Sequence, residues 1–389
     1  MVAAQKLKVT ICGAGRTGHL AAVLFSQKSD IEVTLLSSQH VMPASYQKNG
    51  AQIRAFLPDG AVLAASPCCV TACPYEACSD ADVVIITVPS HARDGVLKRI
   101  QPALPRNKPV FVGAIPGFGG FDWLAEDLLG ALSNVVLWGM KDVPHIAFDL
   151  TLGESVRLGG AKSHLYVALH RRETPAMAGI LLNYLSRLYD SPLMLLEDYL
   201  EITLTPGNPI MHGSVIYGLI GPWGQWHHHP FNHVPCWWND CPELGAYFLA
   251  RCDAENQALC KAAEAVLEID LSSVQPLQQE IMDAYGDLIA NPRTLLSVLR
   301  TNQAYAGIPL PLIRAENSEG YVFDRRHRVF QEDIAFGLGL LVAIGERLKV
   351  PVPCMKEIYL WCSQFMGEVA PHVPLPVTWP EIKVAQECG

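Results

Sequence analysis

Two polar segments in the second half of the chain carry residue types suited to acid–base chemistry. The first, Asn208-Pro209-Ile210-Met211-His212, places a histidine about one turn beyond a helix start. Proline is favoured at the first helical position, and Asn208 can cap the helix in front of it. An imidazole held there can exchange a proton near neutral pH. His212 is therefore a candidate acid–base residue, although taken alone a structural histidine bonded to backbone explains it better.

The second segment runs from residue 325 to residue 334 and leads into an apolar helix. Arg328 lies five residues before Asp333. A guanidinium can hold a substrate carboxylate through two parallel hydrogen bonds. An aspartate at a helix start can orient an imidazolium and stabilise its charge. A basic run in front of a helix is more often a solvated loop. A catalytic role for this segment is therefore supported only when it is considered together with the other motifs.

A third pattern, near the N-terminus, is typical of phosphate binding. Gly13-Ala14-Gly15-Arg16-Thr17-Gly18 follows an apolar run over 7–12 and precedes a helical apolar period. Gly13 suits the tight turn, Gly15 lets the backbone approach a pyrophosphate, and Gly18 allows close helix–strand packing. The free N–H groups and the dipole of the helix that follows favour the phosphates. The pattern predicts a dinucleotide site that includes Arg16 and Thr17.

The end of the second predicted strand, 31–36, bears on which dinucleotide binds. NAD-selective sites usually carry an acid there that binds the ribose 2′-hydroxyl. This chain has Ser37 and Ser38 instead. Their hydroxyls, together with Arg16, could accept a 2′-phosphate. The sequence therefore favours NADP, with NAD as the alternative, and we expect Val88, Pro89 and Pro116 to line the same site after later strands.

Strands and helices must alternate to position these turns. Strands are predicted at 7–12, 31–36, 81–89, 110–112, 135–138, 165–170 and 193–196, with helices at 41–48 and 175–189 and short β-like pieces at 52–56 and 61–64. Ser90 is expected to cap a helix that begins near residue 91. Such alternation predicts an α/β Rossmann domain with a doubly wound parallel sheet, whose ligand lies at the carboxyl ends of the strands.

From about residue 201 the periodicity becomes helical. Helices are predicted at 208–219, 243–267, 277–289, 292–302, 331–348 and 355–366, and no strand is predicted between them. A chain of 389 residues exceeds one typical core, so two domains are the default. We expect a dinucleotide-binding domain over 1–198 and an all-α substrate and catalytic domain over 199–389.

Composition narrows the range of partners. The net charge of −9 argues against nucleic acid, and no apolar run is long enough to span a membrane. We expect a cytoplasmic protein with small-molecule substrates, and a homodimer is left open. The 12 cysteines show no repeated metal-site spacing, so no metal is predicted.

A segment rich in tryptophan and histidine has several interpretations. Trp223-Gly224-Gln225-Trp226-His227-His228-His229 is followed by His233, Cys236, Trp237 and Trp238. Adjacent histidines point in different directions and rarely share one ion, so a metal site is the weakest interpretation. A loop over the substrate cleft and plain surface both remain open.

Taken together, these motifs resemble one family, the opine dehydrogenases, which contains the octopine and nopaline dehydrogenases. The family's Asn-Pro-x-x-His segment is similar to 208–212, and its Arg-x-x-x-x-Asp element is similar to 328–333, with Val329 in place of a tyrosine. Similar order appears at 139–147, 301–308 and 350–353. The resemblance covers nearly the whole chain, because the motifs share order and spacing as well as type.

The resemblance implies reductive condensation of a 2-oxo acid, such as pyruvate, with the amino group of an amino acid, and the reverse oxidation. It implies that His212 is the acid–base catalyst, Asp333 its partner, and Arg328 the carboxylate anchor, with Asn208 and Phe118 at the substrate. The site is expected between the two domains. Phe118 and Ala147 stand where some members carry polar or thiol side chains, which favours an amino donor less polar than arginine.

Two other classes remain open at this point. The runner-up is a two-domain Rossmann reductase that acts on a 2-oxo or 2-hydroxy acid without an amine. Such enzymes usually carry a catalytic lysine on the helix after the sheet, and neither Lys141 nor Lys162 has that setting. A nucleotide-sensing protein without turnover is the third, and the presence of both His212 and Asp333 argues against it.

Overall fold

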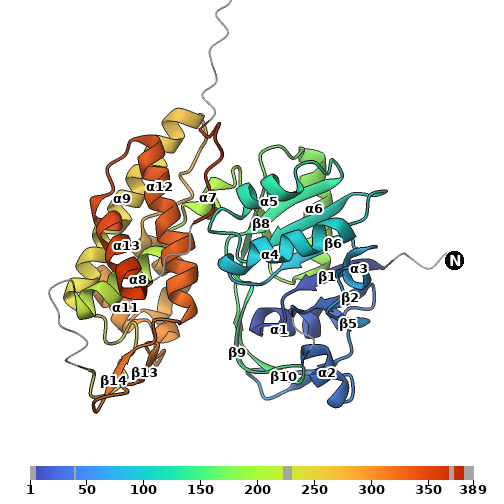
Figure 1. Ribbon diagram of the computed structural model, residues 1–389, viewed down its shortest axis with the longest axis horizontal. Coiled ribbons are helices and arrows are strands. Elements are labelled where there is room, and N and C mark those ends of the chain that lie inside the picture. The colour runs from blue at the N-terminus through green and yellow to red at the C-terminus, as the bar shows by residue number, and fades with distance from the viewer. Residues whose placement is uncertain (1–5, 39–40, 222–229, 368–371, 381–389) are drawn as a thin grey trace, which may run out of the picture. The chain divides into compact units, whose positions relative to one another are not determined.

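The computed structural model describes residues 6–38, 41–221, 230–367 and 372–380 (Figure 1). The chain divides into two compact units, Met1–Thr203 and Leu204–Gly389. The predicted boundary after residue 198 lies next to the short helix α7 (Leu200–Thr203), which ends the first unit.

An eight-stranded sheet forms the centre of the first unit. Its buried apolar strands are typical of a sheet covered on both faces. The strand order is β12 (Leu193–Leu195), β11 (Leu165–Leu169), β8 (Val135–Met140), β7 (Val110–Ala114), β6 (Val83–Ile86), β1 (Leu7–Cys12), β2 (Ile31–Leu36) and β5 (Cys69–Thr71). The order turns back between β1 and β6, which confirms the doubly wound α/β class.

Two layers of helices cover this sheet. On one face, α1 (Arg16–Ser26), α2 (Val41–Lys48) and α6 (Pro175–Leu188) share a core with the strands. On the other face, α3 (Pro74–Cys78), α4 (Ser90–Ile100) and α5 (Phe121–Leu129) form a second core. The two faces of the sheet are thereby shielded from water, and ligands of such sheets bind at the loops that follow the strands.

One pair of neighbours breaks the predicted parallel pattern, because β11 runs antiparallel to β8. The connection between them is a β-ribbon, β9 (His145–Thr151) and β10 (Ser155–Ala161), and no helix crosses the sheet there. The chain therefore returns to the end of the sheet that it left. The ribbon joins β3 (Ile53–Phe56) and β4 (Val62–Ala65) in a second sheet of four strands.

The second unit is helical, as predicted. Its main helices are α8 (Asn208–Ile220), α9 (Glu243–Leu267), α10 (Leu277–Tyr285), α11 (Leu295–Thr301), α12 (Gly339–Leu348) and α13 (Pro353–Met366). The prediction of no strand here is wrong, because β13 (Leu312–Arg314) and β14 (Tyr321–Phe323) form a small antiparallel hairpin. These strands are three residues long, too short to show alternation in sequence. None of the helices in the described ranges has the length and apolarity required to cross a bilayer.

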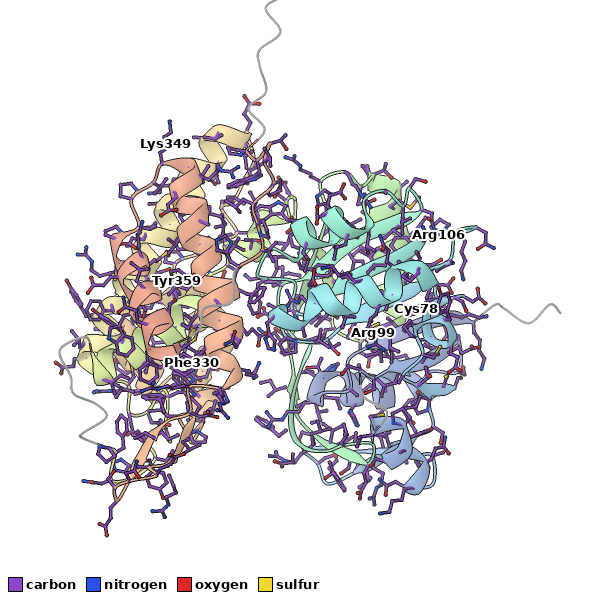
Figure 2. All side chains as sticks on the ribbon, viewed as in Figure 1. Cys78, Arg99, Arg106, Phe330, Lys349 and Tyr359 are labelled. Atoms are coloured by element: carbon purple, nitrogen blue, oxygen red, sulfur yellow. The ribbon has the colours of Figure 1, made fainter. Side chains whose placement is uncertain are left out.

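A π-helix, η4 (Phe330–Leu338), replaces the first half of the helix predicted over 331–348. It continues directly into α12, where Tyr359 of α13 packs so tightly that a Cβ at Gly339 would meet its ring at 2.8 Å. Figure 2 labels Phe330 and Tyr359 in this unit. π-Helical turns are rare and occur often at functional sites.

Two predicted helix caps are wrong. α4 already begins at Ser90, so Pro89 is the cap residue, and the buried Ser90 hydroxyl has no hydrogen-bond partner. Similarly, Asn208 is the first residue of α8, and the cap residue is Gly207. In both cases the helix begins one residue earlier than predicted, which moves the polar side chain out of the capping position.

Candidate active site

The second unit brings His212 and Asp333 into direct contact. The Nδ1–H of His212, one turn into α8, donates a hydrogen bond of 2.8 Å to Oδ2 of Asp333 on the π-helix. The side chain of Asp333 is 4% exposed and that of His212 is 13% exposed. A carboxylate acceptor at Nδ1 leaves the other ring nitrogen, Nε2, to exchange a proton with a ligand.

Two glycines allow α8 to approach the π-helix closely enough for this bond. A Cβ at Gly213 would meet Cδ1 of Ile334 at 2.9 Å, and a Cβ at Gly337 would meet Cγ of Pro209 at 2.6 Å. Both distances are shorter than real Cβ contacts allow. The glycine next to His212 and the glycine one turn after Asp333 thus set the spacing of the pair.

Two tryptophans pack against the imidazole. The centroid of the His212 ring lies 4.4 Å from the Trp237 ring and 5.6 Å from the Trp238 ring. Both indoles are buried, at 5% and 4% exposure. In the sequence these two residues stand out only as members of the Trp/His-rich segment, whose aromatic content is the one sign of this contact.

The basic turn before the π-helix has a second ion pair. Nη1 of Arg328 lies 2.6 Å from Oε2 of Glu332, and the arginine side chain is 60% exposed while the glutamate is 7% exposed. Most donors of the guanidinium therefore remain accessible to a ligand carboxylate. His327 is half-buried, and burial lowers its pKa, with Arg328 acting in the same direction.

The glycine turn of the first unit has the shape that a pyrophosphate requires. Gly13 has φ of +131°, and a Cβ at Gly18 would meet the carbonyl oxygen of Gly13 at 1.8 Å. By contrast, a Cβ at Gly15 would meet nothing within 4 Å, so its backbone is open. The first turn of α1 holds no acidic residue that would repel a phosphate. These residues fit a dinucleotide.

The strand order β7-β6-β1-β2 lines up the other predicted cofactor residues along one edge. Pro116 follows β7, Val88 and Pro89 follow β6, and the glycine turn follows β1. Ser37 and Ser38 follow β2, but only Ser38 is exposed, because Ser37 is buried and its N–H bonds the carbonyl of Thr71. Arg16 is exposed at the start of α1.

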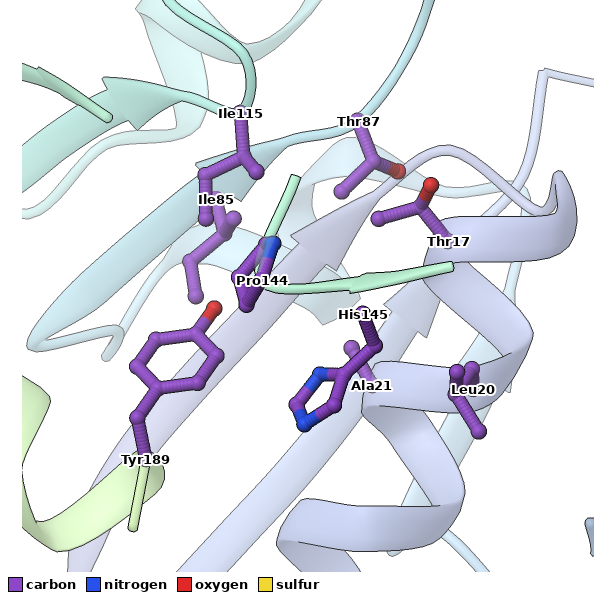
Figure 3. Close-up of a pocket in the computed structure, with 9 residues that line it drawn as sticks. All are labelled: Thr17, Leu20, Ala21, Ile85, Thr87, Ile115, Pro144, His145 and Tyr189. Carbon is purple, nitrogen blue, oxygen red and sulfur yellow. The ribbon is translucent and has the colours of Figure 1, made fainter. Parts of the chain in front are cut away.

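A small pocket lies beside the glycine turn (Figure 3). Thr17 and Thr87 line it together with apolar side chains and, at its other end, His145 and Tyr189. Thr87, which sequence reasoning missed, donates from Oγ1 to the carbonyl oxygen of Gly13 at 3.1 Å. Burial lowers the pKa of His145 and raises that of Tyr189.

His19, a further residue that sequence reasoning missed, fastens the glycine turn from behind. It is fully buried, with Nδ1 donating to the carbonyl oxygen of Gly15 at 3.1 Å and Nε2 accepting the N–H of Gly153 at 2.8 Å. Burial lowers its pKa to about 4, so the ring is neutral at physiological pH. In the sequence, the position of His19 directly after Gly18 is the sign that it could support the glycine turn.

Phe118 lies on the loop between β7 and α5. The buried guanidinium of Arg93 donates hydrogen bonds to the carbonyl oxygens of Phe118 and, at 2.7 Å, of Pro116. The same guanidinium lies 5.6 Å from the centroid of the Phe118 ring. Arg93 therefore holds the loop that carries two of the predicted ligand-contact residues.

The structure describes only part of the Trp/His-rich segment, so the three interpretations of its histidines 227–229 stay predictions. Residues 223–229 lie outside the described residues, whereas Trp237 and Trp238 pack on His212 as described above. Within the ranges that the structure describes, no group of three His, Cys, Asp or Glu side chains could hold a metal ion.

Comparison with protein families gives two matches, one in each half of the chain. A model described as NAD/NADP octopine/nopaline dehydrogenase, alpha-helical domain, matches residues 195–366. A model described as ketopantoate reductase PanE/ApbA matches residues 9–113, which contain the glycine turn.

Whole-chain comparisons point the same way. The chain is 53% identical over 377 residues to y4xO of Sinorhizobium fredii, covering 96% of this chain and 100% of that protein. It is 26% identical to an opine dehydrogenase of Haliotis discus hannai, over 94% and 91% of the two chains. A structure of octopine dehydrogenase with NADH and L-arginine superposes with a TM-score of 0.82 at 24% identity, over 93% and 90% of the chains.

Proposed function

Since the chain belongs to the opine dehydrogenase family and is an NAD(P)-dependent oxidoreductase acting on CH–NH donors, we propose that it condenses a 2-oxo acid with an amino acid. The amino group and the oxo carbon form an imine with loss of water, and reduction gives a secondary amine. The reverse oxidation regenerates the two substrates. The hydrogen bond between His212 and Asp333 carries this proposal.

His212 is the acid–base catalyst in this proposal. Asp333 holds the Nδ1–H, so that Nε2 presents or accepts a proton at the substrate nitrogen. When the imidazole is protonated it donates the proton on Nε2 to the substrate nitrogen as the imine is reduced, and when neutral it takes a proton from the amine in the reverse reaction. The carboxylate of Asp333 orients the ring through this hydrogen bond, as in other His–carboxylate pairs.

Arg328 is proposed as the anchor for a substrate carboxylate. Its side chain is mostly exposed and uses Nη1 for Glu332, which leaves further N–H donors in a planar fork. Asn208 is exposed at the first position of α8, one turn from His212, and we propose it as a neighbouring substrate contact.

The cofactor is held by the first unit. The backbone around Gly13, Gly15 and Gly18 and the start of α1 would bind the pyrophosphate, and the bound nicotinamide supplies a hydride. We propose a preference for NADP, since Arg16 and Ser38 are both exposed beside the position that the ribose phosphate takes in this fold.

The amino donor is proposed to be apolar. Phe118 is partly exposed on a loop that Arg93 holds from behind, and Ala147 is half-buried on β9. Neither side chain could pair with a guanidinium, and burying an unpaired charge is costly. We therefore expect aliphatic or aromatic amino acids to be better donors than arginine.

The test is NADPH oxidation by the purified enzyme across a panel of amino acids, each combined with pyruvate, 2-oxoglutarate or glyoxylate. We expect oxidation only when both an oxo acid and an amino acid are present, with a secondary-amine product identified by mass spectrometry. Equal oxidation with the oxo acid alone would favour the alternative, a reductase that uses no amine. The ketopantoate reductase match over 9–113 supports that alternative for the nucleotide-binding part of the chain only.

A further inference from the structure

The imidazole of His212 is packed between aromatic rings to which the proposed mechanism assigns no role. Trp238 stacks on it at an interplanar angle of 22°, and Trp237 approaches to 4.4 Å between centroids, tilted by 41°. The two indoles also stack on each other, with centroids 5.8 Å apart. The ring of His212 is therefore restrained by its faces as well as by its bond to Asp333.

The segment that carries the two tryptophans is held in place by several hydrogen bonds. The N–H of Trp237 donates to the carbonyl oxygen of Ile308 at 2.9 Å, and the N–H of Leu310 donates to that of Pro235 at 2.9 Å. The guanidinium of Arg300 donates two bonds, of 3.0 and 2.7 Å, to the carbonyl oxygen of Cys241. These bonds tie the segment at both ends, so the indoles have little freedom to leave the imidazole.

A further ring supports the indoles from behind. Tyr305 lies 5.4 Å from Trp238 and 5.0 Å from Tyr285, between ring centroids. The series Tyr285, Tyr305, Trp238 and His212 forms a continuous aromatic contact. Such packed rings fix one another's orientation, since each contact favours a limited set of geometries.

The faces of these rings also bear on the charge of the imidazole. An indole face attracts a cation, by about 0.5–1 kcal/mol when exposed and about 2 kcal/mol when desolvated. On the elements packed against the imidazole, the charged and titratable groups are Asp333 and Glu332 of the π-helix and His327 and Arg328 of the turn before it. On the tryptophan segment, Asp240 accepts the N–H of Cys236. On the other elements packed on α8, Glu357 of α13 bonds Tyr217, and Cys252 of α9 bonds Ser214, so both are engaged away from His212.

We propose that Trp237 and Trp238 are positioning residues that hold the plane of the His212 ring and stabilise its protonated form. This inference rests on the proposed role of His212 as the acid–base catalyst. Asp333 fixes one edge of the ring and the indoles fix its faces, so that Nε2 points in one direction in both protonation states. An acid that must deliver a proton to a particular nitrogen gains from such orientation.

The first experiment needs no substrate. An imidazolium in contact with an indole quenches its fluorescence more strongly than a neutral imidazole does. The tryptophan emission of the whole enzyme, without nucleotide, should therefore fall as the pH is lowered and His212 takes up a proton. The difference between native enzyme and His212→Gln isolates this step from the other histidines. Trp237→Phe should reduce its amplitude, whereas Trp361→Phe, whose ring packs on Tyr217 and Phe365, should not.

The second experiment is kinetic. Trp237→Leu should lower kcat about 2–30-fold, the range that the loss of a cation–π contact predicts, and leave KM for NADPH unchanged. The alkaline limb of its pH–rate profile for imine reduction, where His212 loses its proton, should move to lower pH. Trp237→Phe keeps an aromatic face and should restore most of the activity. Trp361→Leu, in the same unit, is the matched control and should retain the native profile.

Three outcomes would overturn the proposal. One is identical fluorescence titrations of the native and His212→Gln enzymes. Another is a folded Trp237→Leu enzyme with native kcat and pH profile. The third is a Trp237→Phe enzyme as impaired as Trp237→Leu. The fluorescence result does not depend on turnover, so a failure of the proposed reaction with intact quenching would be distinguishable from a failure of this inference.

Discussion

Asp333 is a buried carboxylate whose Oδ2 accepts the hydrogen bond of His212 and whose Oδ1 has no hydrogen-bond partner. Its charge therefore depends strongly on the imidazole. A buried charge that loses its partner is destabilised, so the two side chains act as one unit. We therefore expect a substitution of either residue to lower kcat more than a substitution of any other residue in the second unit.

We expect His212→Ala to lower kcat about 10²–10⁴-fold, the usual contribution of a positioned acid–base group. Asp333→Asn should lower kcat as well and shift the pH profiles of both reaction directions to lower pH, because the orienting charge is lost. NADPH affinity, measured by equilibrium titration, should survive both changes. Superimposable pH profiles of the native and Asp333→Asn enzymes would show that the pair is structural.

The exposed guanidinium of Arg328 predicts an effect on substrate binding. Arg328→Ala should raise KM for the 2-oxo acid about 10–100-fold, the loss expected for hydrogen bonds to a charged group. Arg328→Lys keeps the charge but not the planar fork and should fall between. Arg326→Ala, an exposed neighbour in the same turn, is the matched control and should leave KM unchanged. A change confined to NADPH binding would assign Arg328 to the cofactor.

At the scale of elements, the two adjacent serines at the end of β2 differ in burial. Ser37 is buried at 4% exposure, while Ser38 is exposed. A carboxylate introduced at 37 would be buried and would harm the fold, so only position 38 can report on the cofactor. The difference in burial therefore distinguishes Ser37 from Ser38, which the sequence alone could not do because both are serines.

We expect the native enzyme to have a higher kcat/KM with NADPH than with NADH. Ser38→Asp should reverse this preference, because the new carboxylate repels a 2′-phosphate and can bind a ribose hydroxyl. Ser38→Ala is the control and should weaken NADPH binding without favouring NADH. Equal use of both cofactors by the native enzyme would contradict the predicted preference.

The packing of α8 on the π-helix makes a second prediction at this scale. Gly337→Ala would force its Cβ against Pro209, at 2.6 Å from Cγ, and separate the two helices by a fraction of an ångström. Because His212 and Asp333 lie on these helices, kcat should fall while KM for NADPH stays constant. Gly179→Ala on α6, where a Cβ meets nothing within 4 Å, is the control. A native kcat for folded Gly337→Ala would show that the helix spacing does not control the pair.

At the scale of the whole molecule, the first unit contains buried ionisable groups with opposite effects on stability. Burial lowers the pKa of His19 and His170 to about 4, so protonation as the pH falls below about 6.5 opposes folding. Burial raises the pKa of Asp122 to about 7, so ionisation as the pH rises above about 4 also opposes folding. Between about pH 4 and pH 6.5 a rise in pH therefore removes the penalty of the two histidines and adds that of Asp122, so the two effects partly cancel.

Asp122→Asn tests the alkaline side. Asparagine is neutral at every pH, so the variant should be more stable than the native enzyme at pH 8, by at most about 4 kcal/mol. The gain should disappear at about pH 3, where the native carboxyl is largely protonated in both the folded and the unfolded state. The gain is measured as the difference in free energy of unfolding between the two proteins, from the first transition of denaturant unfolding curves at the two pH values. An equal effect at both pH values would show that ionisation of Asp122 is not the cause.

The amino-acid sequence by itself determined the local features of this protein. The glycine turn, the strands at 7–12 and 31–36 and helix α9 follow from apolar periodicity and from glycine and proline positions, and their residues matched the structure. The family and the NAD(P) cofactor also followed from short motifs in the right order. Such signals depend on neighbours in the chain, which is why they can be recognised without a fold.

Tertiary structure alone decided the features that join distant segments. The bond from His212 to Asp333 spans 121 positions, and the contact of His212 with Trp237 depends on hydrogen bonds from a third segment. The burial of Ser37, the antiparallel β11 and the π-helix likewise arise from packing. Local periodicity predicts which face of an element is apolar, but which element covers that face is set by the free energy of the whole packed unit.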